Sequence, residues 1–138
     1  MTSPSSSLPP SATETRMVDM VFPDQTNHYG TLFGGQALRL MDMSAFITAS
    51  RYARRTVVTA SSERVDFHTP VRQGQLVELV GRVVATGRTS LTVDVELYSE
   101  DLLSGARLLC TRGRFILVAL DAERRPTAVP PLAPENQT

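Results

Sequence analysis

The helix that decides this fold begins inside residues 27–42, which read NHYGTLFGGQALRLMD. Residues 36–41 are all good helix formers, so the helix is expected to start near Gly34 or Gly35. It should run to about Tyr52 or Arg54, where arginines suit the negative end of the helix dipole.

Every other segment with a clear pattern predicts a β-strand. A short strand over Thr15–Phe22 should precede the helix, and four strands in meander-like succession should follow it, over Val57–Phe67, Leu76–Thr86, Thr89–Ser99 and Ala106–Leu120. One long helix against one antiparallel sheet of five to six strands is an α+β architecture. A single helix leaves part of such a sheet and its edges uncovered, so we expect a homodimer or a larger assembly.

The 138 residues suffice for one domain, which we place over residues 14–124. Residues 1–13 are rich in Ser and Pro and predict a disordered leader, and residues 125–138 predict a Pro-rich tail. No apolar run approaches the ~18 residues of a membrane span, so we expect a cytoplasmic protein without membrane insertion. The formal net charge of zero argues against a general nucleic-acid binder.

The reactive side chains are few, which excludes several kinds of site. All fourteen basic residues are arginine, so Schiff-base chemistry on a lysine is excluded. The single cysteine, Cys110, rules out an internal disulfide and falls in an apolar strand pattern, as a core residue would. The histidines and the cysteine lie at positions 28, 68 and 110, and with only these three residues we expect no metal site.

Asp42 is a charged residue with apolar neighbours in the predicted helix. Its helical neighbours are apolar, namely Leu38, Ala45, Phe46 and Ala49. A charged group among such residues costs stability unless a partner satisfies it. Asp42 therefore either serves structure, satisfied by Ser44 or by the backbone, or acts on a substrate.

Several motifs in order carry a family resemblance. The run from Pro23 to Gly35, followed by Met41 and Asp42, resembles the hot-dog-fold acyl-CoA thioesterases, in particular the bacterial short- to medium-chain acyl-CoA hydrolases. Three more segments agree, and the likeness spans about residues 15–130: Val65–Val71, Gly87–Ser90 and Phe115–Asp121. The resemblance implies a long helix wrapped by an antiparallel sheet, and dimers whose sheets join. It also implies hydrolysis of acyl-CoA to a fatty acid and CoA, with no cofactor because CoA is part of the substrate.

Thioester hydrolysis needs an activated water and a polarised carbonyl. Asp42 is the candidate for the first, as general base or as nucleophile, and the sequence leaves both open. Gly34 and Gly35 sit where free N–H groups and the positive helix dipole could stabilise an oxyanion. The alternative is that the two glycines form only a helix-entry turn.

The spacing of these residues predicts a site shared between two chains. Gly34 and Asp42 are eight residues apart, about 12 Å along a helix, whereas reacting atoms must approach within about 3–3.5 Å. We therefore expect Asp42 of one subunit to face Asn27, Gly34 and Gly35 of the other, in dimers that assemble into a tetramer or a trimer of dimers. The resemblance implies the same partnership for Asn27, whose amide would orient water or thioester; the alternative is a loop-capping Asn.

The CoA part of the substrate is expected at Gly87, Arg88, Thr89 and Ser90. This hairpin offers a guanidinium and two hydroxyls to phosphate oxygens, although a solvated hairpin turn explains it equally well. Further arginines could add to phosphate attraction, at positions 54, 55, 124 and 125. Two weaker candidates are Thr59, which could position water, and His68, which is either structural or near the CoA arm.

Two other functions fit the same fold. The first is a non-catalytic module that binds acyl-CoA, which would not need Asp42 beside the thioester. The second is a dehydratase acting on a 3-hydroxyacyl thioester, which relies on a His base. No His lies in the predicted helix, which disfavours the dehydratase, and Asp42 disfavours the binding module.

Overall fold

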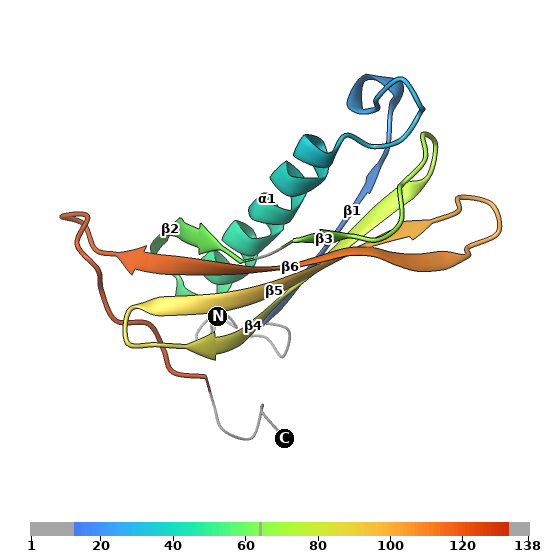
Figure 1. The fold of residues 1–138 in the computed structure, drawn as a ribbon. Helices are drawn as coiled ribbons and strands as arrows, with labels where there is room; N and C mark the ends of the chain where they lie inside the picture. The colour runs from blue at the N-terminus through green and yellow to red at the C-terminus, as the bar shows by residue number, and fades with distance from the viewer. Residues whose placement is uncertain (1–12, 64, 133–138) are drawn as a thin grey trace, which may run out of the picture.

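A computed structural model describes residues 13–63 and 65–132, so nearly all of the predicted leader and the last part of the predicted tail lie outside it. It contains a 20-residue helix and a six-stranded antiparallel sheet (Figure 1). The elements in chain order are β1 (Glu14–Met20), the 3-10 turn η2 (Pro23–Gln25), α1 (Gly34–Ala53), β2 (Thr56–Ser62), β3 (Asp66–Phe67), β4 (Leu76–Thr86), β5 (Ser90–Glu100) and β6 (Arg107–Leu120). The expected architecture is therefore confirmed. Within the described residues, no helix combines the length and apolarity needed to cross a membrane.

The strand order differs from the expected meander. The sheet runs β1-β4-β5-β6-β2, with β3 also pairing with β6, so only β4, β5 and β6 follow one another as neighbours. The prediction of one strand over Val57–Phe67 is wrong, because this segment breaks into β2 and β3 after a bulge between Thr59 and Ser61. At the end of this strand order, β2 pairs with β6 on one side only and forms an edge of the sheet.

The core lies between α1 and the inner face of the sheet. The predicted alternation in β5 is confirmed, because its inner face is fully buried, at Leu91, Val93, Val95 and Leu97. Met41, Ala45 and Ala49 of the helix are equally inaccessible, and Cys110 is a buried core residue as predicted. Burial of this apolar surface is the main stabilising contribution to the fold.

The helix approaches the sheet most closely at Gly81 in β4. A Cβ placed there would lie 2.4 Å from the Thr48 hydroxyl and 2.9 Å from the Ser44 hydroxyl. The Thr48 hydroxyl donates to the Ser44 carbonyl at 2.7 Å, which satisfies it inside the core. Glycine at position 81 therefore sets the distance between helix and sheet.

The C-terminal segment 126–132 packs onto the domain instead of leaving it. Val129 is buried, and its N–H donates to the Arg88 carbonyl at 3.0 Å. The Tyr52 hydroxyl, at the far end of α1, donates to the Pro130 carbonyl at 2.8 Å. The packed unit thus continues past the expected boundary at residue 124 as far as Leu132.

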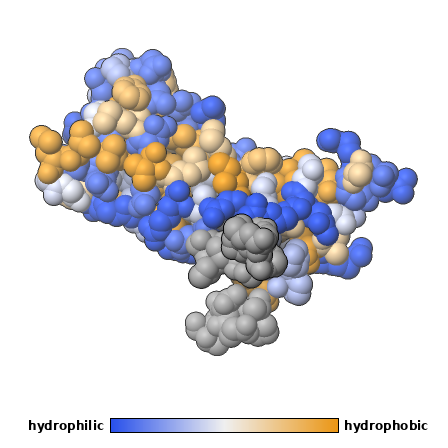
Figure 2. Space-filling view, turned by 180° about the vertical axis from the view of Figure 1, so that it is seen from behind, coloured by the Kyte–Doolittle hydropathy of each residue, from blue (hydrophilic) through white to orange (hydrophobic). Residues whose placement is uncertain are grey.

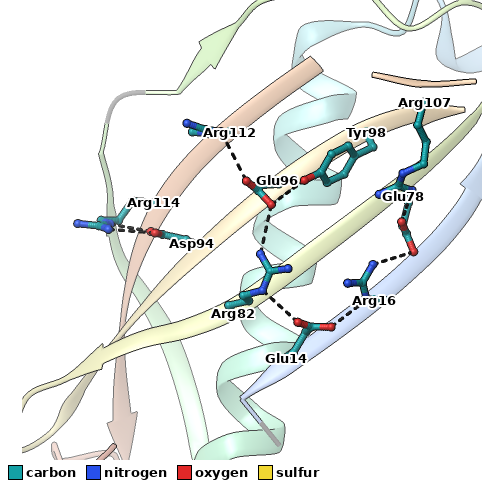
Figure 3. Close-up of polar contacts among 10 residues, drawn as sticks. All are labelled: Glu14, Arg16, Glu78, Arg82, Asp94, Glu96, Tyr98, Arg107, Arg112 and Arg114. Atoms are coloured by element: carbon teal, nitrogen blue, oxygen red, sulfur yellow. Dashed lines mark hydrogen bonds and ion pairs between the residues drawn. The ribbon is translucent and has the colours of Figure 1, made fainter. Parts of the chain in front are cut away.

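The outer face of the sheet carries a lattice of ion pairs (Figure 3). Glu14 bridges Arg16 and Arg82 at 2.8 and 3.0 Å, and Arg114 contacts Asp94 at 2.6 Å. The lattice extends through further pairs, Arg16–Glu78, Arg82–Glu96, Arg107–Glu78 and Arg112–Glu96. The hydrogen bond from Arg16 lowers the pKa of Glu14. Charges on this face therefore largely neutralise one another.

Candidate active site

Two glycines open α1, and nothing in their own chain requires them. The helix begins at Gly34, and no side chain caps its N-terminus. A Cβ at Gly34 or Gly35 would meet no heavy atom within 4 Å, and neither residue has a positive φ. Both are exposed, so their N–H groups stand at the positive end of the helix dipole. The absence of a side chain at these positions leaves room for a ligand or a second chain.

Asn27 holds the loop that leads into the helix. Its Oδ1 accepts hydrogen bonds from the N–H groups of Tyr29 and Thr31, at 2.9 and 3.2 Å, and from the Thr31 hydroxyl at 3.1 Å. Its own N–H donates to the Thr31 carbonyl at 2.8 Å. The side-chain oxygen therefore orders the loop, as the capping alternative expects, while the amide NH₂ has no acceptor among the described residues and can donate outward.

Asp42 lies on an exposed stripe of the helix, one turn from Leu38 and one turn from Phe46. Its apolar neighbours divide between two sides, because Ala45 and Ala49 are fully buried whereas Leu38 and Phe46 are 40% and 46% exposed. Asp42 is itself exposed, so the expectation that it lies on the buried face is wrong for the single chain.

The partner of Asp42 is Thr59 of β2. The Thr59 hydroxyl donates to Asp42 Oδ1 at 2.9 Å, which fixes one carboxylate oxygen and leaves the other open. Ser44, the alternative partner expected from sequence, is fully buried on another side of the helix, and its hydroxyl has no hydrogen-bond partner among the described residues. A hydroxyl–carboxylate pair beside exposed apolar side chains is suited to orienting a water molecule.

Within one chain the two groups of residues stay apart. Two helix turns separate Gly34 from Asp42, about 12 Å at ~1.5 Å per residue. Both Asp42 and the unpaired edge of β2 face outward, so a second chain could reach them. The single chain therefore presents two separate groups of candidate residues. We call them the turn half-site (Asn27, Gly34 and Gly35) and the carboxylate half-site (Asp42 and Thr59).

A cleft of about 270 Å³ opens beside the start of the helix. Its walls are mainly apolar and include Gly34, Ala37, Phe67, His68 and Val71. The His68 N–H donates to the Cys110 carbonyl at 2.8 Å, which anchors the end of β3 against β6. His68 thus lies beside the half-site of Gly34. Sequence reasoning missed Phe67 and Val71 as lining residues, although the motif over residues 65–71 pointed to this segment.

The hairpin expected to bind CoA is well ordered. The Gly87 N–H donates to the Ser90 carbonyl at 2.9 Å, and a Cβ at Gly87 would lie 2.6 Å from the Ser90 hydroxyl. The Ala119 N–H donates to the Thr89 carbonyl, and Arg88 is exposed. The structure does not bring this hairpin to Gly34 or Asn27.

The hairpin lies nearer to Asp42 and Thr59. Thr59 is opposite Leu117 in β6, which is opposite Leu91 in β5, one residue beyond the hairpin. Two strand spacings of about 4.8 Å therefore separate Thr59 from the hairpin's end of β5.

Other candidate positions hold no comparable arrangement. A larger hollow of about 490 Å³ on the outer face is lined by the charged lattice, including Arg82, Asp94, Glu96 and Arg112, whose charges pair with one another. His28 is exposed and contacts the ring of Tyr29, with ring centroids 4.0 Å apart. The part of the chain that the structure describes holds no group of three or more His, Cys, Asp or Glu residues suited to a metal ion.

Comparison with known proteins identifies relatives across most of the chain. Residues 29–106 match the family model of the thioesterase superfamily. A Bacillus subtilis protein named as an uncharacterized acyl-CoA thioester hydrolase is 40% identical over 117 residues, which cover 85% of this chain and 68% of the relative. A solved hexameric acyl-CoA thioesterase is 41% identical with a TM-score of 0.87, covering 91% of this chain and 81% of the other.

A second solved structure is the acyl-CoA hydrolase of Staphylococcus aureus, in complex with butyryl-CoA, CoA and CoA disulfide. It is 35% identical with a TM-score of 0.85, covering 89% of this chain and 75% of the other. Structures of the same enzyme carry alanine in place of one asparagine, one aspartate or one threonine. The replaced asparagine precedes the replaced aspartate by 15 positions, and the threonine follows that aspartate by 17.

Proposed function

The chain belongs to the thioesterase superfamily, and from that premise we propose that it hydrolyses acyl-CoA to a free fatty acid and CoA. The observation that carries the proposal is the exposed carboxylate of Asp42, held by the Thr59 hydroxyl at 2.9 Å. Asn27, Asp42 and Thr59 also have the spacing of the three residues replaced in the S. aureus enzyme.

The active site is shared between two subunits. Asp42 and Thr59 of one subunit face Asn27, Gly34 and Gly35 of the other. Three features support this arrangement: the ~12 Å between the half-sites, the exposed apolar residues that flank Asp42, and the unpaired edge of β2. The hexameric relative supports further assembly into a trimer of dimers.

The chemistry follows from the half-sites. Asp42 takes a proton from a water molecule as that water attacks the thioester carbonyl carbon. The N–H groups of Gly34 and Gly35 and the amide of Asn27 stabilise the negative charge that develops on the carbonyl oxygen. The tetrahedral intermediate then breaks its carbon–sulfur bond, and the departing thiolate receives the proton. The products are the free acid and CoA, and no cofactor is required.

Direct attack by Asp42 is the other route to the same products. It would form a mixed anhydride between Asp42 and the acyl group before water enters. A single turnover in H₂¹⁸O identifies the anhydride route if label appears in Asp42. In the general-base route all label enters the fatty acid, whereas hydrolysis of an anhydride at the Asp42 carbonyl leaves label in the protein.

The test of the proposed function is hydrolysis of a panel of acyl-CoA chain lengths, followed through release of free thiol. We expect release for at least one chain length, and its loss in Asp42→Asn. Asp101→Asn is a matched control, because Asp101 is a partly exposed aspartate that accepts backbone N–H groups at a hairpin tip. No release at any chain length, or unchanged release in Asp42→Asn, would overturn the assignment.

The same panel tests the binding-module alternative. A module would bind acyl-CoA without releasing thiol, so binding is measured beside hydrolysis by calorimetry. Asp42 argues against this alternative, because a protein that only binds thioesters has no use for a carboxylate at the carbonyl. A His-dependent dehydratase is likewise disfavoured, since α1 contains no histidine.

A further inference from the structure

Most arginines that the structure describes fall into two groups that differ in their partners. Those on the outer face of the sheet all sit in the ion-pair lattice. A second group has neither an ion pair nor a side-chain hydrogen bond among the described residues, and five of its members gather at one end of the molecule: Arg54, Arg55, Arg88, Arg124 and Arg125. We call these five residues the basic end.

The topology brings the basic end together from three segments. Arg54 and Arg55 directly precede Thr56, which is opposite Leu120 at the end of β6. The turn containing Arg124 and Arg125 directly follows Leu120. Arg88 joins them through its carbonyl, which accepts the N–H of Val129. In Figure 2 this end lies on the right of the view, where hydrophilic patches stand out from apolar surface.

The turn after β6 is ordered and carries two arginines. Asp121 Oδ1 accepts the N–H groups of Glu123 and Arg125, both at 2.9 Å, and the Asp121 N–H donates to the Arg125 carbonyl. Arg124 adopts a left-handed conformation with φ of 64°. Asp121 and Glu123 are the nearby carboxylates, so the five arginines leave an excess of positive charge here. Unpaired guanidinium groups on a fixed turn suit phosphate groups, which they bind through paired N–H donors.

The basic end lies within reach of the carboxylate half-site of its own chain. Arg55 is four residues from Thr59, about 13 Å at ~3.3 Å per residue of strand. In CoA a long pantetheine arm separates the thioester from the phosphates. When the thioester carbonyl lies near Asp42, the phosphates therefore lie well away from Asp42. The hairpin Gly87–Ser90, which carries Arg88 of the basic end, leads into β5, and β5 lies next to β6.

We propose that the basic end binds the phosphate groups of CoA, and that Arg124 and Arg125 make the enzyme select thioesters carried on CoA over the same acyl group on a carrier without the nucleotide. This inference rests on the proposed function, since it concerns the other end of the same substrate. It assigns a substrate-binding role to the segment after β6, which sequence composition alone marked as a tail.

The experiment compares the variant Arg124→Ala/Arg125→Ala with the wild type on two substrates. One is the acyl-CoA that the wild type hydrolyses fastest, and the other is the matching acyl-N-acetylcysteamine, which has the thioester but no phosphates. We expect KM for acyl-CoA to rise about tenfold with kcat within twofold, because the lost charges act far from the reacting atoms. KM for acyl-N-acetylcysteamine should not change, and the inhibition constant of 3′,5′-ADP should rise with KM for acyl-CoA.

The matched control is Arg16→Ala/Arg112→Ala, which removes the same charge from the outer lattice. Its KM for acyl-CoA should stay within twofold of wild type. The inference is overturned if the Arg124/Arg125 variant keeps the wild-type KM for acyl-CoA, if the control pair raises KM equally, or if KM rises equally for both substrates. Failure of the proposed function looks different, since the wild type would then hydrolyse neither substrate. Arg54→Ala/Arg55→Ala repeats the test should the first variant fold poorly.

Discussion

The two half-sites of this chain are built in opposite ways. The turn half-site, formed by Asn27, Gly34 and Gly35, offers hydrogen-bond donors and a positive helix end but no base. The carboxylate half-site, Asp42 with Thr59, offers a base but no donor for an oxyanion. Each lacks what the other supplies, and eight residues of rigid helix hold them apart. This comparison supports the proposed shared site, in which a second copy of the chain lies against the helix.

Asp42→Asn should have the largest effect. It keeps the shape of the side chain and can still accept the Thr59 hydroxyl, but it cannot take a proton. We expect kcat to fall by about 10²–10⁴-fold, the usual contribution of a general base, with the thermal midpoint almost unchanged. Steady-state kinetics and thermal unfolding check this. A normal kcat in this variant would mean that Asp42 does not act as the base.

Phe46→Arg should separate the half-sites without altering either. Phe46 is 46% exposed one turn from Asp42, so an arginine there puts an unpaired charge into the expected subunit contact. We expect monomers in sedimentation or light scattering and a loss of activity of about 100-fold, in line with the loss of one set of catalytic groups.

Leu103→Arg is the control for this variant, since Leu103 is 95% exposed on the β5–β6 hairpin. It should leave the dimer and its activity intact. A Phe46→Arg monomer with full activity would contradict the shared site.

Gly35→Ala should lower activity but not stability, whereas Gly81→Ala should lower stability but not activity. A methyl group at Gly35 meets nothing in its own chain, and Ala is favoured over Gly in a helix by up to about 1 kcal/mol, so the folded state should not be weakened. Activity should nevertheless fall about tenfold or more, because the methyl group crowds the oxyanion position.

Gly81→Ala should do the reverse. Its Cβ would lie 2.4 Å from the Thr48 hydroxyl, and such overpacking costs about 1–3 kcal/mol of stability. Chemical denaturation and kinetics on both variants test the contrast. Equal losses of stability would mean that Gly35 is a structural residue.

Thr59→Val should have the smallest effect. It removes the hydroxyl that donates to Asp42 Oδ1 but keeps a β-branched side chain on the strand. Loss of this orienting hydrogen bond should lower kcat about threefold to tenfold, corresponding to about 1 kcal/mol. Thr59→Ser should recover most of the rate. Equal rates for the Val variant and the wild type would make the contact structural only.

Local patterns predicted much of this fold. Helix formers after Gly35 placed the start of α1, and alternation in β5 identified its buried face. The break between β2 and β3 was missed because residues 57–67 contain no Gly or Pro to mark it, and only pairing with the long β6 reveals the bulge after Thr59. Packing of Val129 was missed for a similar reason, since Pro-rich composition does not show that one valine reaches the core.

The residues of the proposed site could be selected from the sequence, but their surroundings could not. The sequence singled out Asp42, Asn27, Gly34 and Gly35, yet it could not show that Leu38 and Phe46 are exposed while Ala45 and Ala49 are buried. Helical periodicity identifies the neighbours of a residue, but it does not show whether they are buried within their own chain or against a second chain. An apolar side chain destined for a subunit contact looks in sequence like one destined for the core.

The shared site is tested most directly by mixing two inactive variants. Asp42→Asn and Asn27→Ala are co-expressed, and the assemblies are assayed for acyl-CoA hydrolysis beside each parent. In a shared site, every mixed dimer has one intact site, so random pairing should restore about a quarter of the wild-type activity. Replacing Asn27→Ala by the double variant Asn27→Ala/Asp42→Asn should abolish this recovery. A mixture no more active than its parents would contradict the account, because the site would then lie within one chain.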